Sequence, residues 1–326
     1  MTSGFDHTPV LLPETLDALQ PGPGGRYVDA TLGGGGHAEK ILELSSPDGA
    51  LLGIDADPVA VTAARRRLAH YGERVTVVES YFDALEELVR GAEFGPVDGI
   101  LFDLGVSSPQ LDSAERGFSF QYDAPLDMRL GPGAEHTAAE LVNSLPPSAL
   151  ERIFREYGEE RYARRVAQRI VHERARAPLR TTAELADLVT RAKPRSRQER
   201  IHPATRVFQA LRIAVNQELE RLERALPQAL DVLRDGGRLV VISFHSLEDR
   251  IVKQFMRKEA RGCVCPPDIP ACICGRDPSL RIFTPRPIRA TDAEVARNPR
   301  ARSARLRAAQ KLSVDDRSHT TRGGKA

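Results

Sequence analysis

The chain has 326 residues, of which 41% are apolar and 28% charged, a composition typical of a globular protein of about two domains. No run of about 18 apolar residues is present and the first residues are polar, which argues against a membrane span or a signal peptide and favours the cytoplasm. The net charge of +2 conceals a segregation, because residues 1–150 carry −14, residues 151–212 carry +8 and residues 286–326 carry +7. This distribution excludes a uniformly charged chain and predicts that different segments contact different partners.

Four short apolar runs in the first hundred residues are typical of parallel strands that are buried on both faces. They are residues 27–30, 51–55, 75–78 and 99–103. A helix is expected after the second run, because Asp57 can cap it and the proline that follows suits a first helical turn. The alternation of strands and helices predicts a doubly wound α/β sheet.

This alternation stops near residue 110, and residues 110–145 have the composition of loops. From Leu150 onward apolar residues recur with a helical period. Thr181 and Glu184 have the spacing of a capping box and predict the start of another helix. A long amphipathic helix is expected over residues 207–233, and its apolar stripe could pair two copies of the chain in a homodimer.

A further buried strand is expected at residues 238–243, after about a hundred helical residues. We therefore expect residues 1–109 and 214–285 to form one α/β domain, with residues 110–213 inserted into it as a helical substrate-recognition domain. Residues 286–326 contain almost no large apolar side chains and predict a basic, flexible C-terminal tail.

A glycine-rich turn follows the first strand, in the segment Asp29-Ala30-Thr31-Leu32-Gly33-Gly34-Gly35-Gly36-His37-Ala38. Glycines at such a turn let the backbone approach a ligand closely. Asp55 ends the next strand, where an acid can bind both ribose hydroxyls of a nucleoside cofactor. The pattern fits either NAD or S-adenosyl-L-methionine (AdoMet), although the glycines could also serve only a tight turn.

Asp29 favours AdoMet, because a carboxylate beside the turn would repel a pyrophosphate but attract an ammonium group. The alternative is that Asp29 only caps the helix. A second polar segment, residues 103–110, follows the fourth strand at the edge of the sheet where ligands bind. Methyl transfer to an amine needs acceptors for its N–H groups, and Asp103 and Ser108 have that chemistry, although the segment could be an ordinary turn.

These segments, together with others further along the chain, resemble the RsmH (MraW) family. The matching residues occur in order over nearly the whole chain and are 29–37, 103–120, 125–129, 157–161, 202–206, 243–250 and 298–303. The resemblance implies a class I AdoMet-dependent methyltransferase with an inserted α-helical domain. It also implies methylation of N4 of a cytidine in the decoding centre (P-site region) of bacterial 16S rRNA, with 16S rRNA or the small ribosomal subunit as the partner.

The resemblance also implies roles for single residues. Gly35, Gly36 and His37 would line the methionine end of AdoMet, Asp55 would bind the ribose and Phe82 would lie against the adenine. The full cofactor set is Asp29, Gly33, Gly35, Gly36, His37, Asp55, Phe82, Asp103 and Gln110.

For catalysis we expect Asp103 and Ser108 to orient the amine, with His245 near the target base. DNA amino-methyltransferases stack an aromatic residue on the flipped base, yet the segment Ser107-Ser108-Pro109-Gln110 contains none. The ring would have to come from elsewhere in the chain, and the candidates are Phe118, Phe120, Tyr122 and Phe244.

Two further sets of residues predict binding. The charge of +8 over residues 151–212 favours contact with RNA phosphates over a face that is only solvated. His202 is either an RNA contact or a structural group near a helix start. The predicted RNA-binding set is Arg161, Arg164, Arg165, Arg169, His202 and Arg206. The cysteines occur as two C-x-C pairs that could hold a structural zinc ion or remain free thiols, and they are Cys263, Cys265, Cys272 and Cys274.

Overall fold

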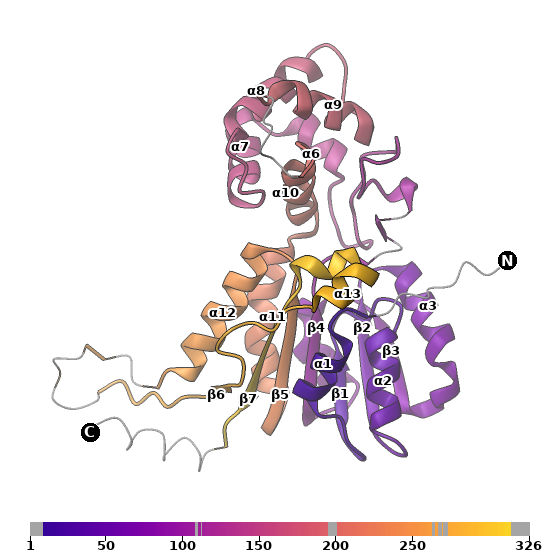
Figure 1. The fold of residues 1–326 in the computed structure, drawn as a ribbon, viewed down its shortest axis with the longest axis vertical. Coiled ribbons are helices and arrows are strands. Elements are labelled where there is room, and N and C mark those ends of the chain that lie inside the picture. Colours follow the sequence, from indigo (N-terminus) through magenta and orange to yellow (C-terminus); the bar gives the residue numbers. More distant parts are fainter. Residues whose placement is uncertain are drawn as a thin grey trace. The chain divides into compact units, whose positions relative to one another are not determined.

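The computed structural model describes residues 9–107, 110–111, 113–194, 201–262, 265–266, 269 and 273–313. The chain divides into two compact units, shown in Figure 1. One unit combines the residues up to Gly105 with those from Glu220 onward, and the other unit spans Val106–Leu219. The insertion expected from the sequence covered residues 110–213. None of the described helices is long and apolar enough to cross a membrane.

The first unit is built on a seven-stranded sheet in the order β3-β2-β1-β4-β5-β7-β6. All neighbouring strands are parallel except β7, which is antiparallel to both β5 and β6. The doubly wound α/β sheet predicted from the sequence is therefore confirmed. The strands are β1 (Arg26–Asp29), β2 (Ala50–Asp55), β3 (Val75–Glu79), β4 (Val97–Asp103), β5 (Leu233–Ser243), β6 (Leu280–Ile282) and β7 (Arg305–Lys311).

Helices cover both faces of this sheet and bury its apolar strands. One core cluster contains side chains from α4, α11 and α12, and the other contains side chains from α1, α2 and α3. Asp57 caps α3 by accepting the Val59 N–H at 3.0 Å, as the sequence predicted. The helices of this unit are α1 (Leu12–Leu19), α2 (Gly36–Leu44), α3 (Pro58–Leu68), α4 (Leu85–Gly91), α11 (Glu218–Val232), α12 (Ser246–Ala260) and α13 (Asp292–Arg297), with 3-10 turns η1 (Ala69–Arg74), η2 (Phe82–Ala84) and η4 (Pro299–Ser303).

The prediction of a flexible tail over residues 286–326 is wrong for the part of it that the structure describes. Strand β7 lies inside the sheet, and Leu306, Ala308 and Ala309 are buried there. Short alanines suffice because the neighbouring strands and helices supply the bulk of the core. The basic residues of this strand are tolerated because Asp249 on α12 binds Arg307 at 2.7 Å.

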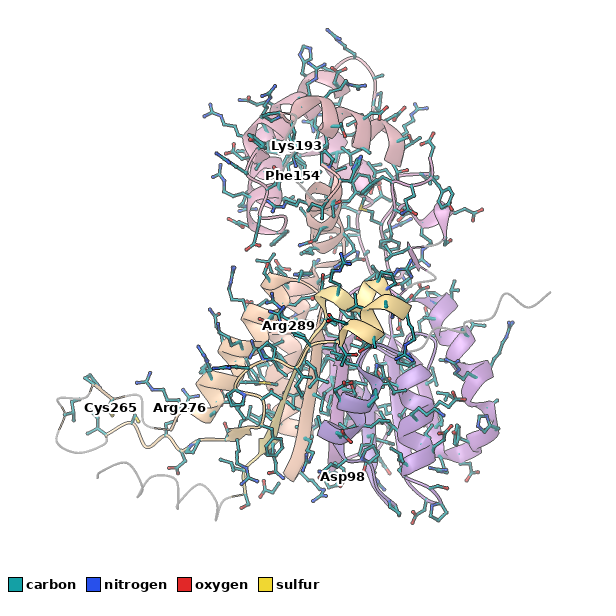
Figure 2. All side chains as sticks on the ribbon, viewed as in Figure 1. Asp98, Phe154, Lys193, Cys265, Arg276 and Arg289 are labelled. Atoms are coloured by element: carbon teal, nitrogen blue, oxygen red, sulfur yellow. The ribbon has the colours of Figure 1, made fainter. Side chains whose placement is uncertain are left out.

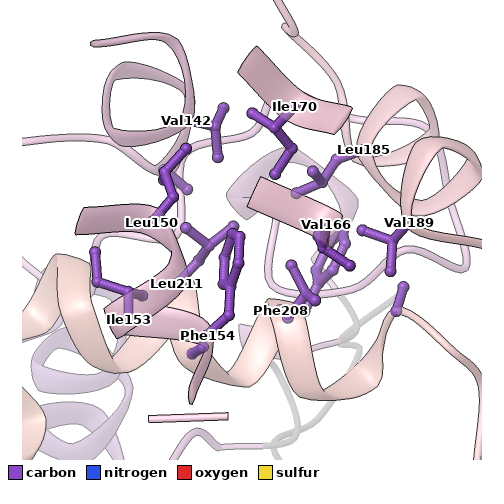
Figure 3. Close-up of a cluster of buried hydrophobic side chains, with 14 of the residues drawn as sticks. Val142, Leu150, Ile153, Phe154, Val166, Ile170, Leu185, Val189, Phe208 and Leu211 are labelled. Atoms are coloured by element: carbon purple, nitrogen blue, oxygen red, sulfur yellow. The ribbon is translucent and has the colours of Figure 1, made fainter. Parts of the chain in front are cut away.

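The second unit is a helical bundle around its own apolar core, drawn in Figure 3. Thr181 and Glu184 form the predicted capping box of α9, in which the Glu184 N–H donates to the Thr181 hydroxyl. Buried Lys193 pairs with buried Glu160 at 2.8 Å near Phe154 in the interior (Figure 2). The elements are η3 (Ala114–Arg116), α6 (Ala138–Ser144), α7 (Pro147–Glu156), α8 (Ala163–Arg174), α9 (Thr182–Ala192) and α10 (Thr205–Asn216).

The single long helix expected over residues 207–233 is instead two helices. Gln217 adopts a left-handed conformation (φ 51°) and separates α10 from α11. Asn216 fixes this end of α10, because its side chain binds the Met128 carbonyl and the Leu130 N–H, both at 2.8 Å. The apolar faces of the two helices are buried in different cores, so this stripe no longer supports the predicted homodimer.

We predict that Leu306→Ala lowers the free energy of unfolding by about 2–5 kcal/mol, because Leu306 is fully buried in β7. Leu44→Ala is the matched control, since Leu44 is 51% exposed and its truncation should change stability by less than about 0.5 kcal/mol. Urea denaturation followed by circular dichroism measures both. A loss as small for Leu306→Ala as for the control would contradict the place of β7 in the core.

Candidate cofactor and RNA-binding sites

The glycine turn is formed where the chain leaves β1 in the middle of the sheet. Its first residues still bond to both neighbouring strands, through Ala30 N–H to Leu101 O and Leu32 N–H to Ile54 O, each at 2.9 Å. Gly33 (φ 51°) and Gly35 (φ 80°) then turn the backbone in conformations that favour glycine. A Cβ atom on Gly36 would lie 2.6 Å from the Pro9 ring, so the start of α2 also requires a glycine.

Three carboxylates lie at the carboxyl ends of adjacent strands around this turn. Asp29, Asp55 and Asp103 end β1, β2 and β4, and β1 pairs with both of the others. Asp55 accepts the N–H groups of Gly33 and Asp57, each at 2.8 Å. The carboxylate at the end of β2 is thus held by the glycine turn itself.

Burial makes two of these acids, Asp29 and Asp55, hard to ionise. Burial raises the pKa of Asp55 to about 6, although backbone N–H groups oppose the shift. Burial raises the pKa of Asp29 to about 7, with nearby His37 opposing and the other two carboxylates adding to the increase. Asp29 also accepts the Thr31 N–H at 3.2 Å, so it stabilises the turn as well. Such a cluster favours a ligand that brings positive charge.

His37 and Asp103 contribute polar atoms that the described residues leave without a partner. His37 is buried, and its Nε2 lies 3.6 Å from an Asp103 carboxylate oxygen. Both ring nitrogens of His37 and the other Asp103 oxygen have no hydrogen-bond partner within the described ranges. The backbone of Asp103 is fixed, since its N–H donates to the Thr31 hydroxyl at 2.6 Å. Buried polar atoms in this state mark a place for a polar ligand.

Phe82 follows β3 at the same edge of the sheet and packs edge-on against Phe102 at 5.7 Å. The neighbouring Asp83 carboxylate binds Arg221 and Arg224 of α11, each at 2.7 Å. Burial would raise the pKa of Asp83, but these two guanidinium groups outweigh it and hold the pKa below its usual value. Asp83 thereby anchors the segment that carries Phe82, and the sequence interpretation missed it. The arginines three residues apart on one helix were the available signal.

His245 has a clear structural role. It caps α12, because its Nδ1 accepts the Glu248 N–H at 3.4 Å, while its Nε2 lies 3.0 Å from the Glu248 carboxylate. Glu248 in turn accepts the N–H groups of Phe244 and His245. The spacing from His245 to Glu248 is that of a capping box, which the sequence interpretation overlooked. The predicted role near the target base stays a prediction.

Three other predictions, on Gln110, Ser108 and the cysteines, are not supported by contacts at the glycine turn. Gln110 belongs to the helical unit, where it is buried and accepts the Ser107 N–H at 2.8 Å. Ser108 lies outside the described residues, as do Cys263 and Cys272. Of the other cysteines, Cys265 is half-buried and Cys274 exposed, so the zinc site stays a prediction.

Four of the five predicted RNA-binding arginines lie in α8 of the helical unit or, for Arg161, two residues before it. Arg161, Arg164, Arg165 and Arg169 are exposed. The exposed stripe continues to His172, three residues after Arg169 on the same helix face. Within the described residues only Arg169 of the predicted four forms an ion pair, with Glu173 at 2.6 Å.

His202 and Arg206 lie near the start of α10 in the same unit. The His202 ring is exposed, stacks on Phe120 at 4.5 Å and accepts the Ala204 N–H at 3.2 Å. Arg206 is exposed and donates to the Glu159 carbonyl at 3.0 Å. His202 therefore has a structural contact and an open ring, and both of its expected roles remain consistent with its position.

The fold and the glycine-rich site define a class I AdoMet-dependent methyltransferase. The sheet is doubly wound with an antiparallel strand inserted next to its edge, and an acid ends the second strand. Within this class the chain belongs to the MraW methylase family, whose model matches residues 4–312. The resemblance seen in the sequence motifs is thus confirmed.

Curated relatives are similar over almost the whole chain. A protein from Geobacter sulfurreducens is 58% identical over 309 residues, which cover 94% of this chain and 99% of the relative. One from Thermomicrobium roseum is 57% identical over 311 residues, covering 95% of each chain. One from Heliobacterium modesticaldum is 55% identical over 312 residues, covering 94% of this chain and 99% of the relative. All three are named ribosomal RNA small subunit methyltransferase H.

We predict that Asp29→Asn raises the melting temperature of the ligand-free protein by a few degrees at pH 8, because it removes a buried charge. Below its unfolded pKa, an acid whose pKa is raised in the folded state is protonated in both states and costs no stability. Its stability cost develops as the pH rises from there through the folded value of about 7. The gain should therefore be larger at pH 8 than at pH 5. Thermal unfolding at both pH values measures it, with and without AdoMet.

The same variant should lose the increase in melting temperature that AdoMet gives the wild-type protein. NAD serves as the control ligand and should stabilise neither protein. A variant that is less stable than wild type at both pH values would show that the hydrogen bond from Thr31 outweighs the buried charge. Unchanged stabilisation by AdoMet would contradict a cofactor role for Asp29.

Proposed function

We propose that this protein transfers the methyl group of AdoMet to N4 of a cytidine in the decoding centre of 16S rRNA. The substrate is either the free rRNA or the rRNA within the small ribosomal subunit. The observation that carries the proposal is the near full-length match to proteins named for methylation of small-subunit rRNA. The acidic glycine turn supports the choice of cofactor. The basic stripe of the helical unit supports an RNA substrate.

Each residue of the first unit would hold a different part of AdoMet. The Asp29 carboxylate suits the ammonium group of AdoMet, and the Gly36 N–H at the start of α2 suits the carboxylate of AdoMet. Asp55 keeps lone pairs for the ribose hydroxyls beyond the two N–H groups that it accepts. The half-buried ring of Phe82 would lie against the adenine.

A nicotinamide cofactor fits these residues less well. The pyrophosphate of NAD carries negative charge and binds at a glycine turn, but here Asp29, Asp55 and Asp103 surround the turn. A doubly anionic group would repel these carboxylates. A cationic sulfonium ligand would instead stabilise their ionised forms. The site therefore favours AdoMet.

Methyl transfer to an amine depends on the positioning of the reactants more than on acid–base catalysis. AdoMet supplies a methyl group on a cationic sulfur, and the lone pair of the exocyclic nitrogen must point at it. We assign Asp103 to accept an N–H of the amine, because one of its oxygens has no partner among the described residues. The N–C bond forms as the S–C bond breaks, and the nitrogen then gives a proton to Asp103 or to solvent. Ser108 would accept the second N–H.

We predict that 16S rRNA from cells that lack this protein is missing one N4-methylated cytidine, which the wild-type gene restores. Asp103→Ala should fail to restore it, because the amine loses its acceptor and is no longer oriented. Mass spectrometry of nuclease digests of 16S rRNA measures both. Circular dichroism of the purified variant checks that its fold is intact, and AdoMet-induced thermal stabilisation shows separately whether the cofactor site is affected. An rRNA whose methylation does not depend on the gene would overturn the proposed function, and near-normal methylation by the variant would reject only the role of Asp103.

We predict that replacing Arg161, Arg164, Arg165 and Arg169 by glutamine weakens RNA binding and makes it less dependent on salt. Each lost phosphate contact lowers the slope of log affinity against log salt by about 0.7–0.9, so four contacts would lower it by about 3. The matched control replaces the same residues by lysine, which keeps the charge. RNA affinity over a series of KCl concentrations and AdoMet affinity by calorimetry are the measurements. AdoMet affinity should not change, and an equal loss of both affinities would contradict a separate RNA-binding role.

A further inference from the structure

A cavity of the methyltransferase unit lies away from the glycine turn, between α12 and the last strands of the sheet. Its volume is about 260 Å³, and Figure 1 shows α12 alongside β6 and β7 in this region. Three of the residues that line it are cationic, three are apolar and none is acidic. They are Lys253, Met256, Arg257, Ile282, Thr284, Pro285 and Arg307.

The buried cation of this cavity is held in a fixed orientation. Arg307 donates from Nε and Nη2 to the Asp249 carboxylate at 2.7 and 3.3 Å, which leaves its Nη1 without a partner among the described residues. Arg305 binds the same carboxylate at 3.0 Å. Two guanidinium groups therefore share one carboxylate, and a net positive charge remains beside the cavity.

The other two cations are not neutralised by any described neighbour. Lys253 is half-buried and Arg257 is exposed, four residues apart on one face of α12. Neither forms a hydrogen bond or an ion pair with a residue that the structure describes. Cations that converge on a cavity without acids are suited to bind an anion. Met256, Ile282 and Pro285 add an apolar surface beside this charge.

The cavity lies two strands away from the end of β4, which carries Asp103. Phe102, next to Asp103, is in register with Val241 of β5, and Val241 is in register with Arg307 of β7. Two strand spacings separate Arg307 from Phe102, which amounts to about 10 Å. An RNA strand can cover that distance within a few nucleotides.

We propose that this cavity binds a phosphate group of the RNA strand a few nucleotides from the target cytidine, with the attached sugar against the apolar residues. The inference rests on the proposed function, since it takes the rRNA as the ligand. It gives the methyltransferase unit an RNA contact of its own, in addition to the basic stripe of the helical unit. The folded C-terminal segment supplies part of this contact through Thr284, Pro285 and Arg307.

The test replaces Lys253 and Arg257 together by glutamine, which preserves helix propensity and leaves the buried Arg307–Asp249 pair intact. The RNA probe is a 16S rRNA fragment that contains the decoding centre. We expect its affinity to fall about tenfold at low salt and the salt slope to decrease by about 0.7, as expected for the loss of one phosphate contact on a single strand. The KM for RNA should rise, while kcat at saturating RNA and AdoMet affinity stay at the wild-type values.

Two matched variants serve as controls. Arg66→Gln with Arg90→Gln removes the same charge from exposed positions of α3 and α4 and should leave RNA affinity near the wild-type value. Lys253→Arg with Arg257→Lys keeps the charge of the cavity and should retain RNA binding. A loss as large in the first control as in the test variant would reduce the effect to net charge and overturn the site.

A free anion is the other source of a phosphate, and calorimetry with inorganic phosphate and with cytidine monophosphate distinguishes it. If the Lys253/Arg257 variant loses binding of these anions but binds the RNA fragment like wild type, the RNA assignment is wrong. Wild-type RNA affinity together with wild-type anion binding would overturn the site altogether. Methylation by the wild-type protein in the same assay separates the two proposals, because its absence counts against the proposed function, whereas methylation with no difference between variants counts only against the cavity.

Discussion

The convergence of three carboxylates on one glycine turn is the constraint on which the methyltransferase unit depends. Parallel strands end at a common edge, so the acids at the ends of β1, β2 and β4 are forced into the same neighbourhood. Burial then raises the pKa of Asp29 to about 7 and that of Asp55 to about 6. This arrangement costs stability in the ligand-free protein and becomes favourable when a cation enters, which is the expected trade between stability and function at a binding site.

Positive charge is concentrated in another segment of the chain. Residues 1–150 carry −14 and residues 151–212 carry +8, and the exposed arginines of α8 lie in the second group. A single surface that had to attract both a cationic cofactor and a polyanionic RNA would weaken one interaction to strengthen the other. Separation of the two charges along the chain removes this conflict, so a net charge near zero is compatible with both ligands.

The sequence alone was sufficient where local physics decides the structure. Buried parallel strands, the Asp57 cap, the Thr181 capping box and the glycine turn each depend on a few neighbouring residues, and each was found where expected. The prediction failed where distant residues decide the outcome. Gln217 interrupts an apparently continuous helix because Asn216 is tied to a loop some 88 residues earlier in the chain.

Strand β7 is a second element whose structure depends on residues distant in the sequence. Its segment is short of large apolar residues, and only contacts with β5, β6 and α12 make it a strand. Asp249 is required for this, because an unpaired Arg307 inside the sheet would carry an uncompensated buried charge. Since Arg305 occupies the same carboxylate, the pairing that allows β7 to fold does not cancel the positive charge of the segment. The residue pair that completes the core thus also leaves the cavity beside α12 positively charged, and a segment that looks like a basic tail in the sequence becomes part of a binding surface through the act of folding.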